Sequence, residues 1–508
     1  KKQDKYVAMF YWTWHQGVDD TTYSVKNISE IVRQYPEAMS SYEHPAWGSK
    51  KPGFFYWEEP LFGYYRTTDT WVLRKHAELL ADAGIDVVFF DCTNGSFTWE
   101  ESYEALMATW SQAQKDGVKV PKMGFMLPFG PAPHSLVSLR QLYRDIYKPE
   151  RYKDLWFIWK GKPCIMAYPD NLTSEKNDRE IADFFTFRPG QPDYVDGPVR
   201  PDQWSWLEMY PQHGYVSGDR GTFEQVFNLP NAYGRNFTVK RGFDPRVDGY
   251  LYGWNFQEQW DRAFELDPEL VFVTGWNEYI AGMWQPKDGW TGKPFSFVDQ
   301  YNWNCSRDIE PNKGWGEKGD VYYLQLVDNV RNFKGMAKPG KASPPKTIKL
   351  GKPGSWDDVQ PYYASYKGNT LHRDCPGRYN TYYKNVSGRN DIVGSKVTHD
   401  EKYIYFYVET ADNLTSSQDP NWMMLFIDTD RNKKTGWNGY DYVINHTSPD
   451  GKNVIIEKSR KDKWIWDAVG KGKCAIHGNI LEIAIEKKLL NLTSTVDIEF
   501  KWCDNMQN

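Results

Sequence analysis

Several features that define common classes of protein are missing from this chain of 508 residues. It has no run of about 18 apolar residues, so no transmembrane helix is predicted. Its net charge is −5, from 62 basic and 67 acidic residues, which argues against binding nucleic acid or an anionic membrane surface. It has no HExxH motif, Cys/His cluster or facial triad, so no catalytic metal is predicted.

Cysteine is also scarce, with 6 residues and no CxxC pair, which argues against structural zinc and thioredoxin-like chemistry. Cys474 and Cys503 lie in the last two strand-like segments and can pair, although their spacing does not establish a disulfide. The chain begins at Lys1 without Met, which fits an exported protein after removal of its signal peptide, or a trimmed chain. We expect a secreted, periplasmic or cell-surface protein.

Aromatic residues, in contrast, are abundant at 17%, with 24 Trp and 34 Tyr in a hydrophilic chain. Such rings either fill large cores or line surfaces and clefts. Sugars suit a ring-lined cleft, because their C–H faces stack on indole while their hydroxyls need polar neighbours. The composition therefore favours a carbohydrate as the partner, and we expect a monomer.

Residues 1–338 show eight strand candidates, most of them separated by a helical pattern, which predicts an α/β fold of the (β/α)8 TIM-barrel type. A barrel needs about 250 residues, so the extra length is expected to form long loops at its mouth. The rival is a doubly wound sheet, but no glycine-rich dinucleotide loop follows the first strand. The strand candidates are 6–14, 85–91, 122–127, the second half of 155–169, 183–187, 203–207, 223–227 and 270–274.

Helical spacing is clearest over 70–83, with Asp69 as the N-cap and Gly84 as the stop. Residues 339–353 are rich in Pro, Gly and Lys without apolar periodicity, which predicts a linker. Short alternating segments over 354–508 predict a β-sandwich domain. Further helices are expected over 102–116, 136–147, 255–264 and 320–334.

The stretch 270–286 carries the first catalytic candidate. An apolar strand runs directly into Trp276, Asn277 and Glu278. Carboxylates rarely follow an apolar strand unless they are paired or functional, and catalytic groups of a parallel barrel collect at the carboxyl ends of its strands. Glu278 is therefore predicted to be catalytic; a capping or salt-bridged glutamate is the alternative.

The first module resembles the barrel of glycoside hydrolase families 71 and 99, on the motif WNEY at 276–279 together with FVD at 297–299, SRDIEP at 306–311 and the helix 322–329. This resemblance implies a glycoside hydrolase. In family 99 a second glutamate follows three residues after the first, whereas this chain has Ala281 there. The partner acid must then come from elsewhere, and α-mannan is not carried over as the substrate. Ala281 also leaves open a second function, a non-catalytic carbohydrate-binding protein with a degenerate barrel.

The second module resembles a family 9 carbohydrate-binding module, on segments 356–359, 398–400, 405–409, 426–430 and 435–437. Asp428 and Asp430 present alternating oxygen ligands after a strand, which is compatible with structural calcium; an acidic turn is the alternative. No other cofactor is expected.

Cleavage of a glycosidic bond normally needs two carboxyl groups. Glu208, after the sixth strand, lies in an aromatic segment that favours a proton donor, and a buried glutamate paired to arginine is the alternative. Asp91, after the second strand, is predicted to bind a sugar hydroxyl, with a catalytic role as the alternative. Asp308 and Glu310 are expected to fix the loop that closes the barrel. Other predicted substrate contacts are Trp12, Trp14, Arg188, Trp206, Gln212, His213, Trp276, Asn277 and Trp284, with core positions as the alternative for the tryptophans.

Overall fold

The computed structural model describes residues 4–15, 27–49, 53–191, 199–205, 208, 211–215, 220–224, 249–284, 295–298, 306, 308–378, 380–461 and 463–507. The chain forms two compact units. The first comprises Lys1–Ala337 and Cys375–Tyr383, and the second Lys338–Asp374 and Lys384–Asn508. A short segment from the second half of the sequence therefore belongs to the first unit. Within the described ranges, no helix has the length and apolar character needed to cross a membrane.

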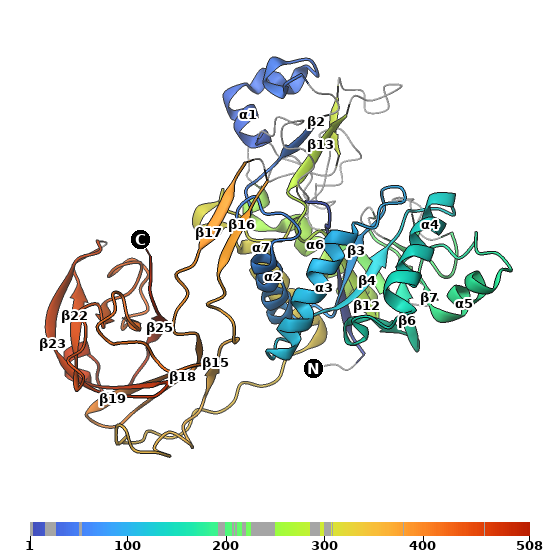
Figure 1. Cartoon of the computed structure of the whole chain (residues 1–508). Coiled ribbons are helices and arrows are strands. Elements are labelled where there is room, and N and C mark those ends of the chain that lie inside the picture. The colour runs from blue at the N-terminus through green and yellow to red at the C-terminus, as the bar shows by residue number, and fades with distance from the viewer. Residues whose placement is uncertain are drawn as a thin grey trace. The chain divides into compact units, whose positions relative to one another are not determined.

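A parallel sheet forms the framework of the first unit (Figure 1). Its central strand β1 (Tyr6–Tyr11) pairs with β12 (Leu270–Thr274) on one side and β3 (Val87–Asp91) on the other. Two further parallel strands, β11 (Arg220–Glu224) and β4 (Lys122–Met126), extend it outward. The last predicted strand therefore lies beside the first, and the carboxyl ends of all five point the same way.

Shorter parallel pairs continue this pattern. A bridge between Met126 and Met166 joins the end of β4 to the segment after β6. The predicted fifth strand, 183–187, is wrong in its first half, because the helix continues through Phe184, whose ring packs on Tyr143 at 5.4 Å. The short strands are β5 (Ile158–Trp159), β6 (Lys162–Ile165), β7 (Thr186–Phe187), β8 (Gly190–Gln191), β9 (Trp204–Ser205) and β10 (Gly214–Tyr215), with β6–β7 and β8–β9 parallel.

Side chains from seven strands meet in one buried cluster. The Trp204 ring contacts Phe89 edge to face at 6.0 Å, so β9 shares its core with β3. Gly124 on β4 makes room for this cluster, because a Cβ there would lie 2.5 Å from the Phe89 ring. The members on these strands are Ala8, Phe10, Val87, Phe89, Met126, Trp159, Cys164, Trp204, Leu270 and Phe272.

The helix predicted over 70–83 is confirmed as α2 (Thr70–Ala83). Asp69 accepts the N–H of Val72 at 3.2 Å, and Gly84 ends the helix in the left-handed region at φ 80°. The predicted helix 136–147 is an α-helix followed by a single π-helical turn, Tyr143–Tyr147. The other helices are α1 (Ile28–Gln34), α3 (Glu100–Lys115), α4 (Pro133–Leu142), α5 (Lys176–Phe184), α6 (Trp254–Leu266) and α7 (Val321–Lys334).

After Glu278 the chain enters a small antiparallel sheet. Its central strand β13 (Ile280–Trp284) pairs with β2 (Gly53–Tyr56) and β14 (Ser296–Val298). Behind this sheet Trp47 packs on the Phe297 ring at 5.5 Å. Glu278 thus lies where the parallel sheet passes into the antiparallel one.

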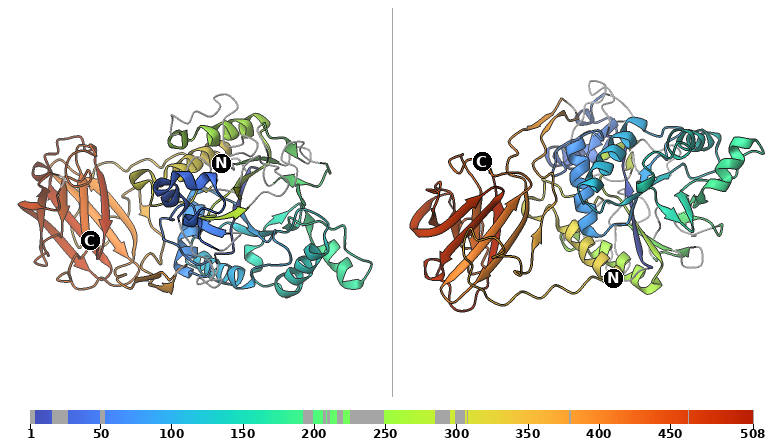
Figure 2. Two further views of the ribbon diagram at one scale, coloured as in Figure 1. Left: turned by 90° about the horizontal axis from the view of Figure 1, so that it is seen from above. Right: turned by 60° about the horizontal axis from the view of Figure 1, so that its bottom comes forward.

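The second unit is a single nine-stranded antiparallel sheet, shown in two views in Figure 2. Side chains from strands at both ends of the order of this sheet share one core, which shows that the sheet is curled. Its strands, in the order of the sheet, are β15 (Tyr363–Ala364), β18 (Ile392–His399), β19 (Tyr403–Thr410), β24 (Ile480–Glu486), β23 (Trp466–His477), β22 (Asn453–Ser459), β21 (Tyr442–Ile444), β20 (Met424–Asp428) and β25 (Glu499–Cys503).

Two predictions from the sequence concern the second unit. Cys474 and Cys503 are both free thiols, because β23 and β25 are separated by three strands of the sheet. The second half of the expected linker is packed: Ile348 is buried in a cluster with Trp356 and Tyr405. Outside this sheet, β16 (Arg373–Pro376) and β17 (Tyr382–Asn385) pair as a hairpin.

Candidate functional site

Glu278 lies just beyond β12 with its backbone held on both sides. Its N–H donates to Asp308 Oδ1 at 2.6 Å, and its carbonyl accepts the indole N–H of Trp57 at 3.1 Å. The same indole lies 3.3 Å from Asp308 Oδ2. All three residues are buried. Asp308 therefore fixes the closing loop, as expected, and orients Glu278 through the main chain.

Asn277 joins the ends of two strands. Its Oδ1 accepts the backbone N–H of Trp12 at 2.9 Å, and its Nδ2 donates to the Trp12 carbonyl at 3.3 Å. The amide group is thus used within the protein. Its predicted contact with substrate stays a prediction.

A ladder of stacked rings begins at Trp12. Trp14 stacks on Trp12 at a centroid distance of 4.1 Å, and Trp99 stacks on Trp14 at 5.8 Å with an interplanar angle of 13°. Phe97 stacks on Trp99 at 5.4 Å. Exposure rises along this ladder from 5% at Trp12 to 62% at Phe97. The ladder therefore leads from the carboxyl ends of the strands to the protein surface.

Asp91 forms a hydrogen bond to Trp14 of the ring ladder. Its Oδ2 accepts the indole N–H of Trp14 at 2.9 Å, while Oδ1 accepts the N–H and hydroxyl of Thr93 at 3.0 and 2.7 Å. The carboxylate is buried. Asp91 thus orients Trp14, and its predicted bond to a sugar hydroxyl stays a prediction.

A buried polar network lies behind Glu278. His76 Nε2 is 2.6 Å from Glu310 Oε1, and its Nδ1 is 2.7 Å from the hydroxyl of Tyr11. Tyr65 donates to Glu310 Oε2 at 2.9 Å. Burial, aided by the Glu310 carboxylate, raises the pKa of Tyr11 and of Tyr65 well above the usual value, so both remain hydroxyl donors. Glu310 thus fixes its loop, as expected.

Trp276 belongs to this network rather than to an exposed platform. The ring is fully buried and meets His76 edge to face at 5.5 Å.

His15 and Tyr279 form a stacked ring pair with centroids 4.1 Å apart at 15°. His15 is fully buried, and neither ring nitrogen has a hydrogen-bond partner among the described residues. Burial, followed by the charge of Arg378 and the electrostatic effect of His76, lowers the pKa of His15 well below its ordinary value. A neutral imidazole therefore lies against the residue that directly follows Glu278.

Glu208, the second predicted acid, is also buried, and its Oε1 contacts Nδ1 of the exposed His213. This contact brings together two residues that the sequence analysis selected. The alternative, a buried glutamate paired to arginine, stays open beside this contact.

The remaining predicted contacts lie in different settings. Gln212 is buried and donates to Gln259 of α6 at 3.1 Å. Arg188 places its guanidinium 5.9 Å from the centre of the Trp204 ring. Trp206 lies outside the described residues, as does the side chain of Trp284.

In the second unit, Asp428, Asp430 and Asp441 each bring one carboxylate oxygen within 4.8 Å of the others. This oxygen set fits calcium chemistry. Lys433 also lies there, with its ammonium 3.0 Å from Asp428 Oδ2, so the cluster already has a cation beside it. Calcium at this position stays a prediction.

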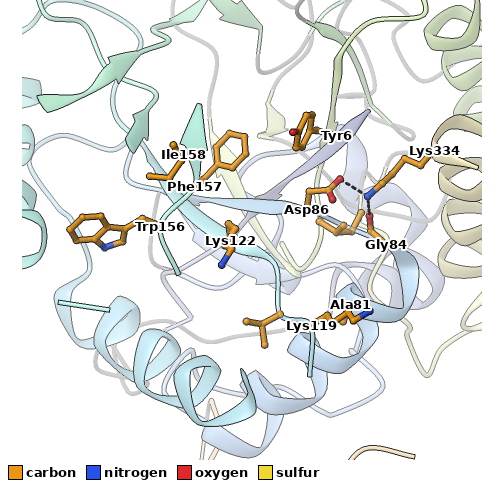
Figure 3. A pocket seen from close by; sticks show the side chains of 12 residues that line it. Tyr6, Ala81, Gly84, Asp86, Lys119, Lys122, Trp156, Phe157, Ile158 and Lys334 are labelled. Atoms are coloured by element: carbon orange, nitrogen blue, oxygen red, sulfur yellow. Dashed lines mark hydrogen bonds and ion pairs between the residues drawn. The ribbon is translucent and has the colours of Figure 1, made fainter. Parts of the chain in front are cut away.

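A groove of about 400 Å³ lies at the opposite end of the parallel sheet (Figure 3). Its lining includes Tyr6 at the start of β1 and Lys122 at the start of β4. There Lys334 donates to the Gly84 carbonyl at 2.7 Å and to Asp86 at 2.5 Å. Because catalytic groups collect at the carboxyl ends of parallel strands, this groove at the amino ends is not the candidate site.

The chain was compared with known proteins and solved structures. No protein-family model matches the chain, and no curated protein matches it. Among solved structures it is similar to the GH99 endo-alpha-mannosidase from Bacteroides thetaiotaomicron. The complex with BIS-TRIS-propane gives a TM-score of 0.39 at 14% identity, covering 66% of this chain and 98% of that one. The structure without it gives 0.36 at 13% identity with the same coverage.

A structure described as a glycoside hydrolase-like protein gives a TM-score of 0.31 at 13% identity, covering 62% of this chain and 95% of that one. At this level of similarity the chain is not assigned to a family.

The sequence analysis missed several residues of the site. Phe97 and Trp99 follow the second predicted strand within eight residues of Asp91, so their position after a strand was a usable signal. Arg378 had no such signal, because it lies beyond the expected linker.

Proposed function

We propose that this protein is a glycoside hydrolase whose site is centred on Glu278. One observation carries the proposal: Glu278 lies at the carboxyl end of a parallel strand, and Asp308 and Trp57 hold its backbone. The neighbouring Asn277 bonds to Trp12, where the ring ladder begins. Stacked rings rising to the surface suit sugar C–H faces. A strand-end carboxyl group suits proton transfer to or attack on a glycosidic bond.

Glu208 is the proposed second acid. It follows β9, whose Trp204 shares a core with β3 and β12, and this supports placing both glutamates at the same end of the sheet. His213, in contact with Glu208, would orient that carboxyl group and exchange protons with solvent. In this proposal the eight predicted strands close into a (β/α)8 barrel, with the shared cluster as its interior.

The second unit is proposed to be a carbohydrate-binding β-sandwich, formed by the curl of its single sheet. A ring cluster of Trp437, Trp464 and Trp466 lies on it, with Trp437 and Trp464 at 4.7 Å, and suits the recognition of sugars. We also propose that the protein works as an exported monomer on a poly- or oligosaccharide.

A second candidate function is non-catalytic carbohydrate binding. The complete burial of both Glu278 and Glu208 favours it, since a catalytic acid must reach its substrate. The test is a panel of polysaccharides incubated with the wild type and with Glu278→Gln, with released sugars analysed by chromatography and the product anomer by NMR. Release by the wild type alone supports the hydrolase, whereas binding without release by either protein supports the second candidate.

A further inference from the structure

The segment Cys375–Tyr383, flanked on both sides by residues of the second unit, is anchored in the first. The hydroxyl of Tyr383 accepts the N–H of Tyr64 at 2.6 Å, and the N–H of Arg378 donates to the Tyr64 carbonyl at 2.7 Å. Arg66 Nε donates to the carbonyl of Gly377 at 2.9 Å. Both main-chain groups of Tyr64 are thus satisfied by this segment, so it is part of the hydrogen-bonding pattern of the first unit.

The fit of this segment is close. A Cβ on Gly377 would lie 2.2 Å from Thr381 Oγ1 and 2.4 Å from the Tyr383 ring within the segment, and 2.8 Å from the Tyr64 carbonyl oxygen. Gly63, at φ +81°, faces the same ring, and a Cβ there would lie 2.4 Å from it. Two glycines on opposite sides of the contact therefore leave room only for this arrangement.

The segment places the backbone of Arg378 on Tyr64, next to the ring pair: the rings of Tyr64 and Tyr65 lie 6.0 and 5.4 Å from the ring of Tyr279. Arg378 is only 5% exposed. Its charge acts on both rings, since it lowers the pKa of His15 and offsets part of the burial that raises the pKa of Tyr279. The hydroxyl of Tyr279 in turn donates to the Tyr65 carbonyl. Arg378 thus favours the neutral form of the imidazole that packs on Tyr279.

We infer that the tip of the β16–β17 hairpin is an integral part of the candidate active site, and that Arg378 is a positioning residue for the segment Trp276–Ile280. Arg378 acts through the His15–Tyr279 ring pair, and Tyr279 directly follows Glu278 in the chain. This inference rests on the proposed function only where it concerns activity. Its structural half, that the tip holds 64–66 and 276–280 in place, stands independently.

The structural half is tested in the full-length protein by hydrogen–deuterium exchange. Gly377→Ala introduces the Cβ that has no room against Tyr64, so exchange should rise at 64–66 and at 276–280. Gly340→Ala is the matched control, because a Cβ there has nothing within 4 Å, and its exchange should equal that of the wild type. Unchanged exchange at 64–66 in Gly377→Ala would overturn the docking of the tip.

Arg378 itself is tested with two substitutions. Arg378→Met keeps much of the length but removes the charge, whereas Arg378→Lys keeps the charge. Exchange at 276–280 should rise in the first and stay near wild type in the second. With a polysaccharide that the wild type cleaves, Arg378→Met should lower kcat about tenfold with KM changed by less than about twofold, and Arg378→Lys should retain most of kcat.

The failures of the two proposals are distinguishable. If the wild type releases no sugar from any polysaccharide, the hydrolase proposal fails while the exchange experiment still decides the role of the tip. If Gly377→Ala loosens 64–66 but Arg378→Met leaves both 276–280 and kcat unchanged, the tip docks but Arg378 does not position the site, and the inference is overturned.

Discussion

Asp308 accepts the backbone N–H of Glu278 at 2.6 Å, so one acid of the first unit fixes the main chain of the candidate catalytic residue. Asp308 thus has a holding role toward the main chain, and Glu278 is the residue proposed for chemistry. The arrangement explains why this segment contains several acids of which one is proposed to be catalytic.

Asp308→Ala should therefore reduce activity while the protein remains folded. The substitution leaves the buried N–H of Glu278 without its acceptor, which costs about 1–3 kcal/mol and lets the loop shift. Sugar release should fall about 10- to 100-fold, mostly in kcat. Asp320→Asn, at an exposed position before α7 where the side chain forms no capping bond, is the control. Equal activity of both variants would contradict the role of Asp308.

The ring ladder predicts an effect on affinity. Phe97 is its most exposed member, so Phe97→Ala should weaken polysaccharide binding without altering the melting temperature. Loss of one stacking ring is worth about 0.5–1.5 kcal/mol, or roughly 2- to 13-fold in affinity. Leu324→Ala, at an exposed apolar position on α7, serves as the control in affinity electrophoresis. Identical mobility shifts for the two variants would remove Phe97 from the binding surface.

The burial of His15 predicts that the stability of the protein depends on pH. The folded-state pKa of His15 is lowered, so the unfolded chain binds a proton that the folded protein does not when the pH falls below about 6.5. The stability contributed by the neutral ring is fully present above that pH and is lost toward acid, by up to about 1.4 kcal/mol per pH unit. The groups that face the ring are Tyr65, Tyr279, His76 and Arg378.

The measurement is the free energy of unfolding of the wild type and of His15→Phe between about pH 5 and pH 7.5. The phenylalanine keeps a ring against Tyr279 but cannot take up a proton. The wild type should lose stability toward acid faster than the variant. Parallel curves would show that His15 titrates alike in the folded and unfolded states.

A substitution at Gly124 tests the packing of the buried cluster in the first unit. Gly124→Ala places a Cβ 2.5 Å from the Phe89 ring, and such overpacking should destabilise the protein by about 1–3 kcal/mol. Gly130→Ala is the control, because a Cβ there has nothing within 4 Å. A melting temperature of Gly124→Ala equal to that of the control would mean that β4 does not pack against Phe89 as described.

The residues that could be predicted from the sequence are those whose roles depend on local pattern. Asp69 and Gly84 delimit α2 because capping chemistry acts over a few residues. The apolar run 270–274 is a buried strand, and the position of Glu278 beyond its end follows from the chain itself.

Roles that depend on contacts between distant segments could not be predicted. Phe184 stays helical because Tyr143 packs on it, and nothing in the local run shows this. The sequence predicts Cys474 and Cys503 in the last two strands, but β24 lies between their strands in the sequence and three strands separate them in the sheet. Arg378 reaches the first unit only because Gly63 and Gly377 leave space for its hairpin, a fit that is invisible without the fold.

The central claim is that Glu278 performs chemistry on a bound sugar, and the most direct test compares sugar release and sugar binding in the wild type and in Glu278→Gln. Glu278→Gln should bind the polysaccharide as the wild type does but release product at least about 100-fold more slowly. The control is Glu269→Gln, a partly exposed glutamate before β12 that pairs with Lys160, and it should retain full activity. Undiminished release by Glu278→Gln would contradict the claim.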